Sequence, residues 1–170
     1  MSFSPIPKYS YRKITDIPVR FFTDRGVALL LLDLDNTIVP YEKKELHGEV
    51  TSWIDRIKAA GIKIFLLSNN RFDSRVGRFA ADIQAEYISP AKKPSAVSIR
   101  RALERNGVRP ENAALVGDQI FADVIAANIA GVVSVAVRPM DMKNPIWAVR
   151  YGLETPFRAL CKNKMGSETV

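Results

Sequence analysis

An unbroken apolar run, VALLLL at residues 27–32, ends directly on the acidic pair of Asp33 and Asp35. A strand that is buried on both faces of a parallel sheet is apolar throughout, whereas a strand with one wet face alternates. Ligands of open α/β sheets bind just beyond the carboxyl ends of such strands. The run therefore predicts a central parallel strand with carboxylates at the edge where ligands bind.

Four more apolar runs follow along the chain, and helical patterns separate them. Three of the helical patterns end at glycines, as helices commonly do. This alternation predicts a three-layer α/β fold with a central, mostly parallel five-stranded sheet. The later runs are IKIFLL at 62–67, EYIS at 86–89, AALVGDQ at 113–119 and VVSVAV at 132–137, and the glycines are Gly61, Gly107 and Gly131.

Length and composition favour one globular unit. The 170 residues are 47% hydrophobic and 25% charged, close to the average of globular domains. The apolar runs are far shorter than the roughly 20 residues that cross a bilayer, and no leading segment has the pattern of a signal peptide. The single cysteine, Cys161, cannot form an internal disulfide. We therefore expect a cytoplasmic protein.

The net charge of +7 lies mainly in the two flanks of the chain. Residues 1–26 carry +3, residues 27–137 carry +1 and residues 138–170 carry +3. Net charge informs about partners rather than about fold. Two interpretations stay open: a solvated basic surface, or affinity for an anionic surface such as the inner face of a membrane.

Polar side chains follow four of the predicted strands at the points where they end. Because the carboxyl ends of parallel strands meet at one edge, we expect these side chains to lie together. Clustered carboxylates repel and take up protons unless a cation neutralises them, and hard oxygen ligands suit Mg²⁺. This edge is therefore a predicted magnesium site, and its residues are Asp33, Asp35, Ser68, Asn69, Lys92, Lys93, Asp118 and Asp123.

Four motifs in this order resemble the haloacid dehalogenase (HAD) superfamily of phosphatases and phosphotransferases. They are Asp33-Leu34-Asp35-Asn36-Thr37, then Ser68, then Lys93 before Pro94, and finally Gly117, Asp118 and Asp123. The stretches DLDNTIV, LLSNN, AKKP and VGDQIFADV are most similar to the YqeG-like branch of capless phosphatases. The resemblance covers about residues 14–140. It implies one Rossmann-like phosphatase domain over residues 1–170, in which 141–170 form a basic C-terminal extension.

The resemblance also implies a role for each motif residue. Asp33 is the nucleophile that forms an aspartyl-phosphate, and Asp35 protonates the leaving group and then activates water. Mg²⁺ is held by Asp33, the backbone carbonyl of Asp35 and Asp118, while Asp123 orients these ligands or joins them through water. Lys93 offsets the negative charge of nucleophile and phosphate. The phosphate-binding residues are Thr37, Ser68 and Asn69.

Several of these residues also have an ordinary structural interpretation. Asp33 and Asp35 could simply terminate a strand, and Ser68 with Asn69 could form a turn. Lys92 lies one residue farther from the proline than Lys93 and could be a solvated loop residue. Other residues near the motifs are His47, for which a surface position is expected, and Asn70 and Arg71, which could contact substrate or lie in a solvated turn.

The spacing of the motifs leaves no room for a cap domain. One loop and one helix fit between Asp35 and Ser68, and one helix and one strand fit between Ser68 and Lys93. A site without a lid needs a substrate or partner large enough to cover it, such as a lipid headgroup, a nucleic-acid end or a phosphoprotein. The YqeG-like branch is similar to phosphatases acting on phosphatidylglycerophosphate, which makes this lipid phosphate the candidate substrate.

Two other classes of protein share parts of the pattern. A receiver-like signalling domain also gathers aspartates, a hydroxyl and a lysine around Mg²⁺, but its paired acids precede its phosphorylated aspartate, and here the order is reversed. A nucleic-acid-binding protein, or a nucleic-acid-end phosphatase on the same scaffold, would account for the basic flanks. The intact motifs favour the enzyme. The oligomeric state does not follow from the sequence.

The segment 144–164 lies outside the four motifs. Pro145 after Asn144 predicts the start of a helix. This helix either packs on the domain or rests peripherally on an anionic membrane, helped by the basic N-terminal flank. Its predicted apolar side with basic edges comprises Ile146, Trp147, Val149, Arg150 and Leu153, continued beyond Pro156 by Phe157, Arg158 and Leu160.

Overall fold

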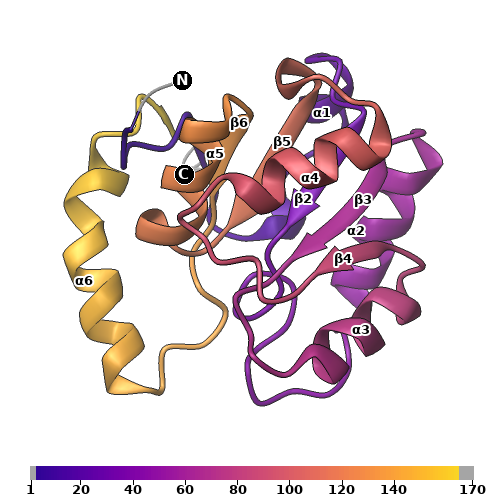
Figure 1. Ribbon diagram of the computed structural model, residues 1–170. Helices are drawn as coiled ribbons and strands as arrows, with labels where there is room; N and C mark the ends of the chain where they lie inside the picture. Colours follow the sequence, from indigo (N-terminus) through magenta and orange to yellow (C-terminus); the bar gives the residue numbers. More distant parts are fainter. Residues whose placement is uncertain (1–2, 165–170) are drawn as a thin grey trace.

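The computed structural model describes residues 3–164, and its centre is a parallel sheet with strand order β4-β3-β2-β5-β6-β1-β7 (Figure 1). The strands are β1 Tyr9–Ser10, β2 Leu29–Leu32, β3 Lys63–Leu67, β4 Glu86–Ile88, β5 Ala113–Gly117, β6 Val133–Ala136 and β7 Asn163–Lys164. The α-helices are α1 Val19–Thr23, α2 Gly48–Ala59, α3 Asp73–Asp82, α4 Val97–Asn106, α5 Ile125–Ala130 and α6 Pro145–Ala159. Short turns of other helix types are η1 Ile14–Asp16, η2 Pro110–Asn112 and the π-helical η3 Ile120–Val124.

The five predicted strands are β2 to β6, so the α/β class is confirmed, while the strand number is corrected from five to seven within residues 3–164. The two additional strands, β1 and β7, have two residues each and lie at the β6 edge of the sheet. Tyr9 of β1 pairs with Val135 on one side and with Asn163 on the other. A two-residue strand is too short to produce an alternating or apolar pattern, which explains why it was not predicted.

The central strand β2 lies between β3 and β5, and all four of its leucines are fully buried. Successive side chains of a strand point to opposite faces. Leu30 and Leu32 therefore join the core beneath α1, α2 and α3, whereas Leu29 and Leu31 join the core beneath α4 and α5. Helices on both faces of the sheet give the predicted three layers (Figure 1).

The connections between the first strands are short. A loop and α2 join β2 to β3, and α3 joins β3 to β4, so neither crossover contains a cap domain. The edge of the sheet that receives the polar residues is therefore not covered by an inserted domain.

Among the described residues, no helix is both long and apolar enough to cross a membrane.

The C-terminal helix α6 lies beside strand β6 and helix α5 (Figure 1). Asn144 caps it by accepting a hydrogen bond from the Ile146 amide at 2.9 Å, as predicted, and Pro156 lies inside the helix rather than at a boundary. Phe157 packs on a small cluster of Ile120, Val124 and Ala136. The C-terminal half of the helix thus packs on the domain.

The fully buried side chains of α6 are charged, and several of its apolar side chains face solvent. Glu154 and Arg158 are the buried residues of this helix. Ile146, Val149 and Leu153 are 74%, 64% and 64% exposed, and we call these three residues the outer stripe. The interpretation of this segment as a helix packed on the domain expected the apolar side to face the domain, whereas the membrane interpretation requires that side to face outward, as the outer stripe does.

Candidate active site

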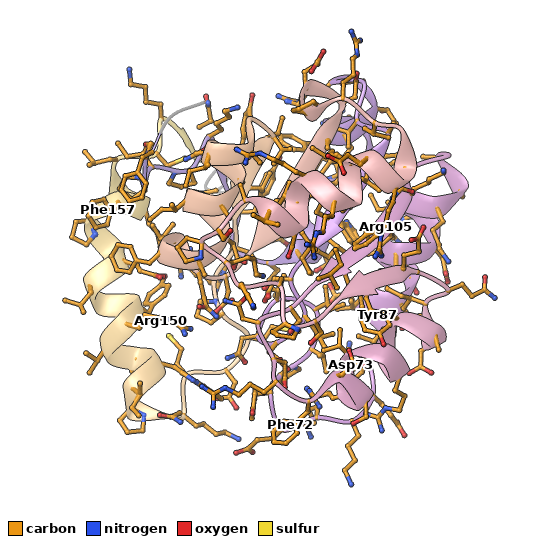
Figure 2. All side chains as sticks on the ribbon, in the orientation of Figure 1. Phe72, Asp73, Tyr87, Arg105, Arg150 and Phe157 are labelled. Carbon is orange, nitrogen blue, oxygen red and sulfur yellow. The ribbon has the colours of Figure 1, made fainter. Side chains whose placement is uncertain are left out.

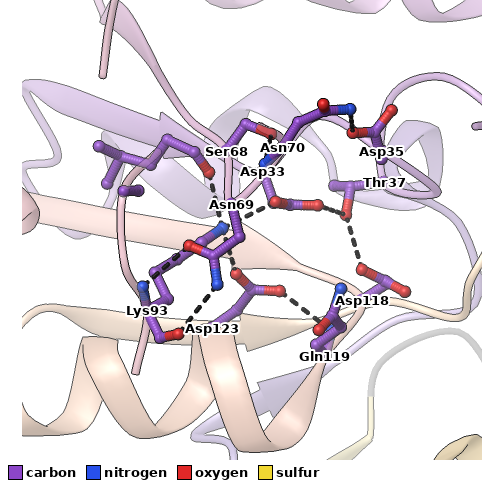
Figure 3. Close-up of polar contacts among 12 residues, drawn as sticks. Asp33, Asp35, Thr37, Ser68, Asn69, Asn70, Lys93, Asp118, Gln119 and Asp123 are labelled. Atoms are coloured by element: carbon purple, nitrogen blue, oxygen red, sulfur yellow. Dashed lines mark hydrogen bonds and ion pairs between the residues drawn. The ribbon is translucent and has the colours of Figure 1, made fainter. Parts of the chain in front are cut away.

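Residues that follow four neighbouring strands meet at one edge of the sheet (Figure 3). Asp33 comes directly after β2, Ser68 after β3 and Asp118 after β5, while Lys93 lies in the loop after β4. These side chains are buried although they are polar, and so is Asp123. Buried polar groups need partners, and here they largely provide them for one another.

Lys93 lies at the centre of this group (Figure 3). Its Nζ atom is 2.7 Å from Asp33 Oδ1 and 2.6 Å from Asp123 Oδ1, and it also donates to the Leu67 carbonyl at 2.6 Å. The Asn69 side chain fixes the backbone of Lys93, because its amide donates to the Lys93 carbonyl and its oxygen accepts from the Lys93 N–H, both at 2.9 Å. These contacts hold Lys93 beside two carboxylates.

The carboxylates are strongly perturbed by their surroundings. Burial raises the pKa of Asp33 to about 7, with Lys93 opposing the shift and Asp123 adding to it. Burial also raises the pKa of Asp118 well above its usual value, and the neighbouring Asp33 and Asp123 act in the same direction. Burial lowers the pKa of Lys93, but the charges of Asp123 and Asp33 outweigh it, and the net shift is upward. One ammonium group faces three acids, so the group has an excess of negative charge.

Three of these acids have the arrangement of a metal site. One carboxylate oxygen from each of Asp33, Asp118 and Asp123 lies within 4.8 Å of the others, and all three side chains are buried. Hard oxygen ligands and uncompensated negative charge fit a divalent cation such as Mg²⁺. The carboxylate of Asp35 lies outside this cluster, as expected if that residue offers its backbone carbonyl.

Gly117 of the fourth motif lies so close to Asp123 that there is no room for a side chain at this position. A Cβ atom on Gly117 would lie only 2.2 Å from Asp123 Oδ2, so a larger residue would displace the Asp123 side chain. Asp123 belongs to the π-helical turn η3, and its Oδ2 atom accepts a hydrogen bond from the Gln119 amide at 3.0 Å. π-Helical turns are frequent at functional sites. Within the predicted helix at 121–130, only Ile125–Ala130 are regular α-helix.

Asp35 is held apart from the acidic cluster by two side chains. Arg75 of α3 donates from Nε to Asp35 Oδ1 at 3.0 Å, and Asn70 donates to Asp35 Oδ2 at 2.7 Å. Arg75 also donates to the carbonyls of Lys43 at 2.7 Å and Pro40 at 3.3 Å, which ties the loop after β2 to α3. The carboxylate orientation is thus fixed from outside the first motif.

The two hydroxyl groups lie on either side of the acids. Thr37 donates to Asp33 Oδ2 at 3.0 Å and lies 3.5 Å from Asp118 Oδ1. Ser68 Oγ accepts from the Asn70 amide at 3.0 Å and lines a pocket of about 300 Å³ together with Asp33 and Asp35. The Ser68 hydroxyl proton can be donated to an oxyanion in this pocket, whereas the single hydroxyl proton of Thr37 is already donated to Asp33.

A sequence model described as haloacid dehalogenase-like hydrolase matches residues 9–131. The chain belongs to this family. Among curated proteins, "Probable phosphatase YqeG" of Bacillus subtilis (strain 168) is 28% identical over 135 residues, which are 79% of this chain and 78% of the relative. "Phospholysine phosphohistidine inorganic pyrophosphate phosphatase" of Xenopus laevis is 39% identical over 72 residues, 39% of this chain and 26% of that relative.

Solved structures of haloacid dehalogenase-like phosphatases share the fold. The Moraxella catarrhalis 3-deoxy-D-manno-octulosonate 8-phosphate phosphatase, solved with a magnesium ion, a phosphate ion and a KDO molecule, has a TM-score of 0.56 at 16% identity, covering 83% of this chain and 77% of that chain. The enzyme of that name from Yersinia pestis has a TM-score of 0.53 at 15% identity, covering 79% and 84%. The predictions of the family, of the fold and of a phosphatase-type enzyme are confirmed.

The predicted site residues of this haloacid dehalogenase-like hydrolase lie together, and the other residues near the motifs differ in position. Asn69 lines the pocket, and both ends of its side-chain amide contact the Lys93 backbone, which uses one of the two N–H donors of the amide. Lys92 is exposed, in contrast to the buried Lys93. His47 is exposed as expected, and its Nδ1 caps α2 by accepting from Glu49. Arg71 lines the pocket rim.

Three functional-site arginines were not predicted as such from the sequence. Arg75 contacts Asp35 from α3. Arg158 of α6 donates to the Asp118 carbonyl, to the Val137 carbonyl at 2.9 Å and to Glu154 Oε2 at 3.2 Å. Arg150, about two turns earlier on α6, reaches the Asp118 carboxylate. No motif marks these positions, because their contacts depend on how α3 and α6 pack against the motif loops.

Proposed function

We propose that this protein is a Mg²⁺-dependent phosphomonoesterase that works through an aspartyl-phosphate on Asp33. The observation that carries the proposal is the position of the Asp33 carboxylate between the Lys93 ammonium and the Thr37 hydroxyl, beside the acids of the fourth motif. Phosphoryl transfer requires an in-line nucleophile and concentrated positive charge around the phosphoryl oxygens. Lys93 supplies one such charge, and the acidic cluster suits a metal ion that supplies the rest.

The residues divide the reaction into two steps. In the first, an Asp33 oxygen attacks phosphorus and the bond to the leaving oxygen breaks, while Asp35 gives its proton to the departing alkoxide. In the second, water attacks the same phosphorus, Asp35 takes the water proton, and inorganic phosphate leaves as Asp33 is regenerated. Ser68 donates to a phosphoryl oxygen. A Mg²⁺ ion bound by Asp33, Asp118 and the Asp35 carbonyl, with Asp123 in support, would neutralise developing charge on the phosphoryl group.

The substrate that we propose is a lipid phosphate at an anionic membrane, with phosphatidylglycerophosphate as the leading candidate. No cap domain is inserted between the described strands β2 and β4, so a substrate held at a surface can reach the pocket. The outer stripe of α6 is apolar and exposed, and the two basic flanks of the chain each carry +3. Apolar side chains with nearby basic groups are the features that bind anionic lipid surfaces.

Activity measurements test the reaction and the substrate together. Phosphate release is measured with and without Mg²⁺ on phosphatidylglycerophosphate in mixed micelles, nucleotides, sugar phosphates, phosphopeptides and 5′-phosphorylated RNA. We expect Mg²⁺-dependent activity that Asp33→Asn removes, with the lipid preferred. Asp33-independent activity would contradict the mechanism. A preference for RNA ends, accompanied by salt-sensitive RNA binding, would instead support the nucleic-acid-end phosphatase.

Asp35 is tested by varying the leaving group. An aryl phosphate needs less acid assistance than an alkyl phosphate, so Asp35→Asn is expected to lose more activity on the alkyl substrate. Equal losses on the two substrates would contradict the role of Asp35 as acid.

Membrane contact is tested by vesicle sedimentation of the full chain. The variant Ile146→Ser/Val149→Ser/Leu153→Ser is compared with Val97→Ser, which changes an exposed apolar residue on α4 that is 49% exposed. We expect binding to anionic vesicles at low salt that the triple variant loses and the control retains. Equal sedimentation of all three proteins, or binding to neutral vesicles alone, would contradict the proposed contact.

A further inference from the structure

One wall of the pocket that contains the proposed nucleophile comes from α6, outside the four motifs. Trp147 and Arg150 line this pocket together with Tyr41 of the loop after β2. The rings of Tyr41 and Trp147 pack edge to face with centroids 5.4 Å apart, which joins the helix to that loop. Figure 2 shows Arg150 on the side of α6 that faces the sheet. The site therefore has a cationic and aromatic wall that no motif residue forms.

Arg150 makes fewer polar contacts with the protein than Arg75 and Arg158, the other two arginines that contact residues of the site. Arg75 donates to Asp35 and to two carbonyls, and the terminal nitrogens of Arg158 donate to Glu154 and two carbonyls. Within residues 3–164, Arg150 makes a single ion pair, from Nη2 to Asp118 Oδ2 at 3.4 Å. Its Nε atom is buried without a hydrogen-bond partner. Its side chain is 29% exposed, so a ligand in the pocket can reach the guanidinium.

Arg150 and Lys93 contact different acids of the site. Lys93 contacts Asp33 from the β4 side, and a divalent cation would be held by the acidic cluster of Asp33, Asp118 and Asp123. Arg150 reaches the site from the opposite side, through Asp118, and none of its contacts is with Asp33. Its positive charge is thus available to a part of the substrate beyond the scissile phosphorus.

We propose that Arg150 binds a second anionic group of the substrate, a phosphodiester or a carboxylate carried by the leaving group, with Trp147 and Tyr41 packing beside it. This inference rests on the phosphomonoesterase proposed above and specifies its substrate class as a phosphomonoester with a second negative charge. A guanidinium presents paired N–H donors that match the two oxygens of such groups, and a lysine cannot reproduce this fork. Loss of a charged hydrogen bond of this kind typically costs about 10- to 100-fold in recognition.

The test compares two aryl phosphates that differ by one anionic group. The substrates are phenyl phosphate and 4-carboxyphenyl phosphate. The proteins are the wild-type chain and the variants Arg150→Met, Arg150→Lys and Arg101→Ala. Arg101→Ala is the control, because it removes an exposed positive charge on α4. The measured quantity is the ratio of kcat/KM for the two substrates. We expect Arg150→Met to lower this ratio about 10-fold or more, Arg150→Lys to restore it in part, and Arg101→Ala to leave it unchanged.

Equal losses on both substrates in Arg150→Met would overturn the proposal, because they would place Arg150 at the transferred phosphoryl group or in support of Asp118. An unchanged ratio would overturn it as well. Binding of the two compounds to the Asp33→Asn protein, with and without Arg150→Met, gives the same comparison without turnover. If the proposed phosphomonoesterase function were wrong, the wild-type chain would release no phosphate from either compound. The difference in binding between the two compounds could still be measured.

Discussion

The central sheet and the C-terminal helix bury opposite kinds of side chain. β2 places four leucines in the core, and its first polar side chain is Asp33 at the ligand edge. α6 turns Glu154 and Arg158 toward the domain and leaves the outer stripe in solvent. The surface that α6 meets explains the difference: it includes the carbonyls of Val137 and Asp118, which need donors. An apolar pattern therefore predicts which side chains an element buries when its neighbours are apolar. It does not predict the buried side of an element that packs on a polar site.

The largest expected effect is at the end of β2. Asp33→Asn should reduce phosphatase activity by about 10³-fold or more, because it removes the nucleophile. The fold should remain intact or become more stable, since one of several crowded acids loses its charge while Lys93 keeps Asp123. Phosphate release and thermal unfolding of the same preparation measure both quantities. Wild-type turnover by the variant would contradict the assignment of the nucleophile.

A change in the buried charged pair of α6 tests the other half of the comparison. Arg158→Met should lower the free energy of unfolding by about 3–5 kcal/mol, because it leaves the Glu154 carboxylate buried without its partner. Chemical denaturation measures this loss. The double variant Glu154→Leu/Arg158→Met should recover part of it, since it removes both charges. If Arg158→Met unfolded like the wild-type chain, the polar packing of α6 would not contribute to stability.

An apolar truncation in β2 should be nearly as costly. Leu31 is fully buried between the sheet and the helices α4 and α5. Leu31→Ala should destabilise the protein by about 2–5 kcal/mol, through lost apolar contact and the cavity left behind. Denaturant titration gives the value. A loss below the range expected for a core leucine would mean that β2 is less tightly enclosed than its burial indicates.

The same truncation on the outer stripe should have the smallest effect. Leu153 is 64% exposed, so Leu153→Ala should change the free energy of unfolding by at most about 0.5 kcal/mol. The comparison with Leu31→Ala uses the same chemical change in the two regions. A loss of several kcal/mol at Leu153, measured in the same titration, would show that the stripe is covered in solution by another surface.

Much of the site could be predicted from the sequence because it lies where buried strands end. Asp33, Ser68 and Asp118 each follow an apolar run directly, and parallel strands bring such positions to one edge. The choice between Lys92 and Lys93 needed the structure, which buries the second beside Asp33 and exposes the first. Asn69 shows a further limit: the contacts of its side-chain amide with the Lys93 backbone could not be predicted from the sequence.

What the sequence determined by itself was the α/β class, the strands β2 to β6 and the acidic edge, because burial on both faces of a sheet leaves a local apolar signature that ends where the core ends. Only the tertiary structure decided the two-residue strands β1 and β7, the contact of Arg75 with Asp35 and the inward face of α6. These features arise from partners distant in the chain, and a two-residue pairing or a charged contact has no periodic signature of its own. Arg150 belongs to this second group, since its helix brings it to Asp118 across 32 residues of sequence.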